Sequence, residues 1–120
     1  MLGMARRDLT ALQGMGNAKV FSDEIFGFHV EQAVEKTLKA WIAGLGCEYP
    51  HTNDLGRLFA LLADRGEDTE PFQALVVFTP FGVQFRYEAY DDMDELPLDR
   101  ATALEAVRAM IAHVAARMAR

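Results

Sequence analysis

The stretch FGVQFRYEAY, residues 81–90, contains side chains whose types suggest a binding surface. Arg86 stands between two aromatic residues, with Phe85 before it and Tyr87 after it. A guanidinium can hold a phosphate through paired hydrogen bonds, and an aromatic ring or the guanidinium itself can stack on a nucleobase. Arg86 and Tyr87 therefore predict a nucleotide-binding or partner-binding surface. The alternative is an ion pair between Arg86 and a carboxylate such as Glu35, which would join two helices.

Other kinds of site find less support in the residue types. His29 and His51 lack the spaced companions that a metal site needs. Cys47 is the single cysteine, which excludes an internal disulfide and fits a reducing compartment. The glycines at 14 and 16 follow no strand, so they indicate the end of a helix and not a phosphate loop. We expect no metal and no cofactor.

The composition bounds the size of the fold and the kinds of partner. A chain of 120 residues, 51% of them hydrophobic, predicts one domain over residues 1–120 with a core of its own. Its formal charge of −6 argues against a broad phosphate-binding face, so any contact with nucleic acid should be local or shared with a partner. The sequence shows no leader pattern and no apolar run that could cross a bilayer, which predicts a cytoplasmic protein with no membrane contact.

The hydrophobic spacing predicts a mainly helical chain. Four segments have apolar residues at intervals of three or four: residues 4–16, 20–45, 54–66 and 98–120. Gly44 and Gly46 should end the second helix, and Gly66 should end the third. Thr52 or Asn53 is the expected cap at the start of the third helix.

The segment from 72 to 90 fits two descriptions. Residues 81–90 alternate between apolar and polar, as a half-buried strand does. Thr79 and Pro80, however, form a good helix start, with a capping side chain followed by proline at the first helical position. A lone hairpin would be marginally stable in an otherwise helical chain. We therefore expect a helix capped by Thr79.

Three stretches in order resemble the HEPN family, whose name means higher eukaryotes and prokaryotes nucleotide-binding. FHVEQAVEKTLKAWI, residues 28–42, is similar to the family's signature helix, HTNDLGRLFALL, residues 51–62, to its second motif, and FTPFGVQFRY, residues 78–87, to its third. The resemblance covers nearly the whole chain. It implies an all-α, antiparallel up-and-down bundle of four to five helices, commonly a homodimer. It also adds Glu35, Lys36 and Lys39 of the signature helix to the predicted nucleotide- or partner-binding residues.

Two positions depart from the family pattern. Asn53 stands where the family's second motif commonly has histidine, so no role of that histidine can be carried over. Glu88 stands where the third motif often has proline, so the helix could continue towards Tyr90.

The second helix has more large apolar side chains than one buried stripe of a bundle needs, and Phe26 and Trp41 are among them. We expect these two residues to form the interface of a dimer.

Many HEPN domains are metal-independent ribonucleases with an arginine and a histidine in one helix, and Arg108 and His113 match that spacing. The histidine would move a proton while the arginine holds the scissile phosphate. Ala109 stands where the motif has a polar residue, and five helical positions rotate the two side chains by about 140°. In the alternative, Arg108 is solvated and His113 flanks the core.

The sequence thus leaves three hypotheses for function. The first is an accessory module that binds a nucleotide or a partner, resembling the bacterial and archaeal HEPN proteins paired with a minimal nucleotidyltransferase in a toxin–antitoxin-like system. The second is a ribonuclease toxin that acts on RNA through Arg108 and His113, or through Arg86 with a base that the sequence does not identify. The third is a structural dimer without a ligand. The acidic charge and Ala109 favour the first.

Overall fold

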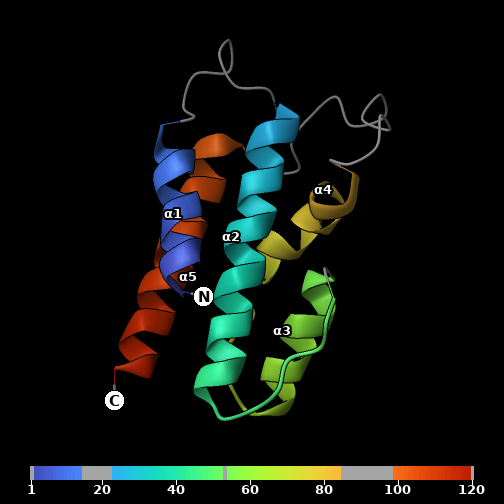
Figure 1. Cartoon of the computed structure of the whole chain (residues 1–120), viewed down its shortest axis with the longest axis vertical. Helices are drawn as coiled ribbons and strands as arrows, with labels where there is room; N and C mark the ends of the chain where they lie inside the picture. The colour runs from blue at the N-terminus through green and yellow to red at the C-terminus, as the bar shows by residue number, and fades with distance from the viewer. Residues whose placement is uncertain (1, 15–22, 53, 85–98, 120) are drawn as a thin grey trace.

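The computed structural model describes residues 2–14, 23–52, 54–84 and 99–119 of the chain. The described residues are helical or irregular, which confirms the predicted all-α bundle (Figure 1). Its elements are α1 (Leu2–Gln13), α2 (Asp23–Gly44), α3 (Leu55–Asp64), the 3₁₀ segment η1 (Glu70–Phe78), α4 (Thr79–Gln84) and α5 (Arg100–Met118). None of these helices is long and apolar enough to cross a membrane.

The long helix α2 is the centre of the bundle, because it contacts α1, α3, η1, α4 and α5. In Figure 1, α1 and α5 cover one side of α2, and α3, η1 and α4 cover the other. The connection after α2 runs back beside the position of α3 and reaches the start of that helix. As a result, α3 runs in the same direction as α2 in this view. That return places the irregular connection between α2 and α3 against the surface of α3.

The core forms where the apolar stripes of these helices meet. The α2 residues in it are at most 1% exposed, and they are Phe26, Val30, Ala33, Val34, Leu38, Trp41 and Ile42. The last helix contributes Ala103, Val107, Met110, Ile111 and Val114. Phe26 is 1% exposed and Trp41 is inaccessible within the single chain, so the prediction that these two residues form the interface of a dimer is wrong.

Glycine ends α2 and α3 as the sequence predicts. Gly46 has φ of 80° and Gly66 has φ of 79°, the left-handed conformation that a side chain disfavours. The residue after each glycine donates its N–H to a carbonyl five positions back, Cys47 to Ile42 and Glu67 to Leu62, which satisfies carbonyls that the helix end leaves free. The chain therefore turns sharply at both places.

The start of α3 differs from the expectation. The capping side chain is Asp54, which accepts a hydrogen bond from the N–H of Arg57 at 3.4 Å. Thr52 accepts instead from the N–H of Asp54, so it supports the capping residue and does not cap the helix itself. Asn53 lies outside the described residues. A carboxylate at this position also stabilises the helix, because its negative charge lies at the positive end of the helix dipole.

The segment from 72 to 84 is helical, which settles the first half of the ambiguous stretch. Thr79 is the first residue of α4 and not its cap: its hydroxyl donates to the Val76 carbonyl at 2.9 Å and accepts from the N–H of Leu55 at 3.3 Å. It therefore joins α4 to the start of α3. Phe81 is 1% exposed and packs on Gly27 of α2, where the missing side chain leaves room for the ring.

Candidate functional site

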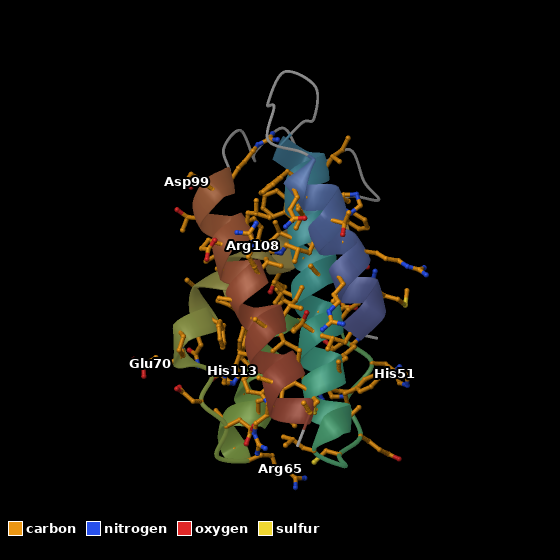
Figure 2. All side chains as sticks on the ribbon, turned by 90° about the vertical axis from the view of Figure 1, so that its left-hand side faces the viewer. His51, Arg65, Glu70, Asp99, Arg108 and His113 are labelled. Atoms are coloured by element: carbon orange, nitrogen blue, oxygen red, sulfur yellow. The ribbon has the colours of Figure 1, made fainter. Side chains whose placement is uncertain are left out.

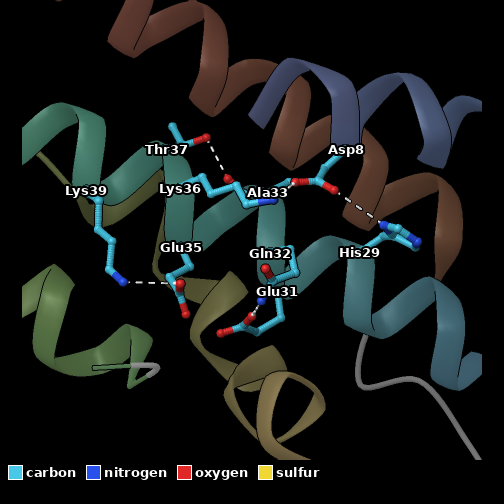
Figure 3. A network of polar contacts seen from close by, with 9 residues as sticks. All are labelled: Asp8, His29, Glu31, Gln32, Ala33, Glu35, Lys36, Thr37 and Lys39. Atoms are coloured by element: carbon cyan, nitrogen blue, oxygen red, sulfur yellow. Dashed lines mark hydrogen bonds and ion pairs between the residues drawn. The ribbon is translucent and has the colours of Figure 1, made fainter. Parts of the chain in front are cut away.

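The polar side chains of α2 divide between two sides of the helix (Figure 3). Towards α1, the Lys36 ammonium lies 2.8 Å from Asp8 Oδ2, and His29 Nδ1 lies 3.4 Å from Asp8 Oδ1. Asp8 is 9% exposed. This buried carboxylate therefore needs polar partners, and it has two of them, Lys36 and His29, on the neighbouring helix. Lys36, which the resemblance adds to the binding surface, thus joins α1 to α2.

The other side of α2 carries Glu35 and Lys39. The Lys39 ammonium lies 3.2 Å from Glu35 Oε2, an ion pair that the four-residue spacing of a glutamate before a lysine favours in a helix. The same ammonium lies 5.6 Å from the centre of the Tyr49 ring, within the range of a cation–π contact. Lys39 therefore stands between a buried carboxylate and an aromatic ring of the following connection.

Glu31 and Glu35 form a buried acidic pair one helical turn apart. Glu31 is inaccessible to solvent and Glu35 is 9% exposed. Gln32 donates to Glu31 Oε1 at 2.7 Å, but within the described residues no group outside the pair donates to Glu31 Oε2 or Glu35 Oε1. Burial, and then the charge of Glu35, raises the pKa of Glu31 from 4.5 to about 8. Buried carboxylate oxygens without partners lower the stability of the folded protein. Such a pair is therefore a candidate functional site.

A groove lies between the connection after α2 and the outer surface of α3. It has a volume of about 530 Å³ and is lined by Glu48, Tyr49, Pro50, Arg57, Ala60, Leu61 and Asp64. Tyr49 is half-buried, whereas the Arg57 guanidinium is exposed and makes no ion pair with a described residue. The groove combines an aromatic ring, a guanidinium and two carboxylates in a space of the size that small ligands occupy.

Sequence reasoning did not identify Tyr49 and Arg57 as site residues. Arg57 lies inside the second family-like stretch, which was the available signal. Tyr49 stands next to Pro50 in a segment interpreted only as a break between helices. A neighbouring hollow is lined by Cys47, Glu48, Tyr49 and His51, so Glu48 and Tyr49 border both spaces.

Arg108 and His113 point into different surroundings (Figure 2). The Arg108 guanidinium lies 2.9 Å from Glu105 Oε2 on the exposed side of α5. The His113 ring lies 5.1 Å from the ring of Trp41 and 5.4 Å from that of Phe72. This arrangement matches the alternative in which the arginine is solvated and the histidine flanks the core.

Of the remaining residues considered in the sequence, some lie within the described ranges and some do not. Arg86 and Tyr87 lie outside the described residues, and so does the proposed ion pair of Arg86 with Glu35. No group of three or more His, Cys, Asp or Glu side chains within the described ranges could hold a metal ion. Cys47 is half-buried, and its thiol lies 3.9 Å from the Leu45 carbonyl oxygen.

A family model, described as the HEPN domain, matches residues 1–116. Searches of the curated proteins and of the solved structures each found no match.

Proposed function

Because the chain belongs to the HEPN family, we propose that it is an accessory module that binds a nucleotide in the groove formed by Tyr49 and Arg57. The groove itself is the observation that carries this proposal. We further propose that the module is a homodimer and the companion of a minimal nucleotidyltransferase in a toxin–antitoxin-like pair, as its family-like stretches suggest.

The side chains that line the groove suit the parts of a nucleotide. The Tyr49 ring offers a stacking surface to a base, and Arg57 can donate two parallel hydrogen bonds to a phosphate. Glu48 and Asp64 can accept hydrogen bonds from amino or hydroxyl groups of the base and ribose. Each chemical group of the ligand would therefore have a matching group in the groove.

The charges in the groove favour a small ligand with few phosphates. Among the described residues that line the groove, Arg57 is the one cation, and Glu48 and Asp64 are anions. The whole chain has a formal charge of −6, so a long phosphate backbone would meet repulsion outside the groove. We therefore propose a nucleoside monophosphate as the best-matched ligand.

Calorimetric titration of adenosine monophosphate into the purified chain tests the groove. Arg57→Gln removes the charge and the paired donors and should weaken binding at least tenfold, since hydrogen bonds to charged groups contribute about 1.5–3 kcal/mol each. Tyr49→Ala should also weaken it by removing the stacking surface. The matched control is Arg65→Gln, a change to an exposed arginine just past the end of α3 that does not line the groove.

Equal affinities for the parent chain, Arg57→Gln and Arg65→Gln would place the ligand elsewhere. The absence of binding to adenosine, guanosine, cytidine and uridine monophosphates would overturn the nucleotide role. The partner role has a separate test, because a minimal nucleotidyltransferase co-expressed with the chain should copurify with it. Two well-folded proteins that elute separately would contradict that part of the proposal.

A further inference from the structure

We propose that a ligand phosphate in the Tyr49–Arg57 groove draws the Lys39 ammonium away from Glu35, and that the Glu31–Glu35 pair takes up a proton as the ammonium leaves. This inference rests on the proposed function, because it concerns how the same groove is regulated. It predicts that ligand affinity depends on pH although no histidine lines the groove.

The position of Lys39 carries the first step. Its ammonium is bonded to Glu35 at 3.2 Å and lies over the ring of Tyr49, a residue of the groove lining. A lysine has a flexible four-carbon stem and three donors, so it can move a short distance without a change in the helix. A phosphate held by Arg57 in the groove that Tyr49 also lines would add a second anion that attracts this ammonium. Lys39 would then be shared between two competing anions.

The dependence of the acidic pair on Lys39 carries the second step. Among the described residues, no group outside the pair bonds to Glu35 Oε1 or Glu31 Oε2, and Lys39 is the cation in contact with the pair. Lys36, on the other side of α2, forms an ion pair with Asp8, with its ammonium 2.8 Å from Asp8 Oδ2. Loss of the Lys39 contact would leave two buried carboxylates in adjacent turns with no cation in contact.

The other helices supply no replacement cation within the described residues. The sides of η1 and α4 that face the core carry Phe72, Leu75, Phe78 and Phe81. The ionisable residues of α3 and η1, namely Arg57, Asp64 and Glu70, are exposed, and so are Arg6 and Arg7 of α1. The basic residues of α5 are engaged elsewhere: Arg100 over the Phe26 ring, Arg108 with Glu105, His113 against Trp41 and Arg117 with Glu67.

The pair already carries about half a proton at pH 8, because the pKa of Glu31 is about 8. Loss of the cation favours the protonated form further, because each negative charge disfavours the other and burial disfavours both. Such a pair titrates as a unit, and the proton that it takes up belongs to both groups. The proton comes from the buffer and converts a carboxylate into a carboxyl group, so the balance of the step at pH 8 is one ammonium moved and up to about half a proton bound.

Calorimetry in two buffers measures this proton directly. Adenosine monophosphate is titrated at pH 8 in HEPES and in Tris, where its own phosphate is fully ionised and the two buffers differ in their heat of ionisation. A net uptake of up to about half a proton should give different apparent enthalpies in the two buffers. An uptake of half a proton would weaken the affinity by about threefold for each unit of rising pH.

Three variants separate this inference from simpler explanations. Glu31→Gln removes the titrating group at the deepest position and should bring the two enthalpies together while binding persists. Lys39→Met leaves no ammonium to move and should also abolish the buffer difference. The control Glu70→Gln changes an exposed acid of η1 and should leave the difference as it is in the parent chain.

The outcomes distinguish this inference from the proposed function. Binding with equal enthalpies in both buffers would overturn the proton uptake and leave the nucleotide site intact. A buffer difference that survives in Glu31→Gln and Lys39→Met would assign the proton to another group and overturn the mechanism. No heat in either buffer would overturn the nucleotide site, and the linkage with it.

Discussion

The indole N–H of Trp41 donates a hydrogen bond of 2.8 Å to the carboxylate of Glu67. The same carboxylate accepts two hydrogen bonds from the Arg117 guanidinium, at 3.1 and 3.2 Å. One side chain in the connection after α3 therefore joins α2 to α5. The pKa of Glu67 is lowered by the hydrogen bonds from Arg117 and then from Trp41.

Glu67→Ala should reduce the free energy of unfolding by about 2 kcal/mol, because it leaves the wholly buried indole N–H of Trp41 without an acceptor. The control is Glu70→Ala, an exposed glutamate three residues later, which should change stability by less than about 0.5 kcal/mol. Urea denaturation at pH 7 measures both. Since the pKa is lowered in the folded state, the contribution of Glu67 is present at neutral pH and is lost as the pH falls below 4.5. Equal losses in the two variants would contradict this role.

The buried acid Glu31 should make the chain less stable as the pH rises. Its pKa is about 8 in the folded protein against an ordinary value of 4.5, so the folded state binds the proton more tightly than the unfolded state. The contribution of Glu31 to the free energy of unfolding is therefore greatest below pH 4.5. It declines as the pH rises from 4.5 to 8. Glu31→Gln removes this dependence and should stabilise the protein at pH 8.5, by up to about 5 kcal/mol.

Urea denaturation of the parent chain and of Glu31→Gln at pH 4.5 and pH 8.5 checks this prediction. The two proteins should have similar stability at the acidic pH and differ at the alkaline pH. Glu105→Gln, at an exposed position, should follow the parent chain at both. A constant difference between the parent and Glu31→Gln at the two pH values would show that Glu31 does not titrate in this range.

Gly27 and Gly3 should respond in opposite ways to the same substitution. Gly27 lies inside α2, where alanine is intrinsically better than glycine by about 1 kcal/mol, and Gly3 lies in the first turn of α1, where the same preference is smaller. A Cβ on Gly3 would meet nothing within 4 Å, so Gly3→Ala should stabilise the protein. A Cβ on Gly27 would collide with the Phe81 ring, which is buried and cannot move aside.

Gly27→Ala should therefore lower the free energy of unfolding by about 2 kcal/mol despite the gain in helix propensity. Thermal denaturation of the two variants measures the contrast. A stabilised Gly27→Ala would mean that α4 packs on α2 more loosely than the structure shows. Phe81→Leu combined with Gly27→Ala should recover part of the loss, because the smaller side chain leaves room for the methyl group.

Local spacing was enough to predict most of the helices. Apolar residues at intervals of three and four indicate α2 and α5, and the glycines at 46 and 66 indicate sharp ends, because these signals depend on neighbours in the chain. The prediction of Thr79 as a helix cap was wrong for the opposite reason. Thr79 accepts its hydrogen bond from Leu55, which is 24 residues away, and no local pattern contains that partner.

The same limit explains which parts of the candidate site could be predicted. The pairing of Glu35 with Lys39 follows from their four-residue spacing and is observed. The partner of Lys36 is Asp8, which is 28 residues away, and the groove of Tyr49 and Arg57 exists only because the chain folds back along α3. Contacts created by tertiary packing leave little trace in the spacing of residues.

The placement of Arg108 and His113 predicts the behaviour of the chain towards RNA. Arg108 is bonded to Glu105 at the exposed surface, while the His113 ring contacts Trp41 and Phe72. A catalytic pair would need both side chains at one phosphate. We expect the purified chain to leave a labelled mixed RNA uncut in excess chelator. His113→Ala should cost about 1 kcal/mol of stability through lost ring contacts, and Arg108→Ala less than about 0.5 kcal/mol. Cleavage that disappears in both folded variants would establish a ribonuclease whose two residues meet only in an assembly of chains.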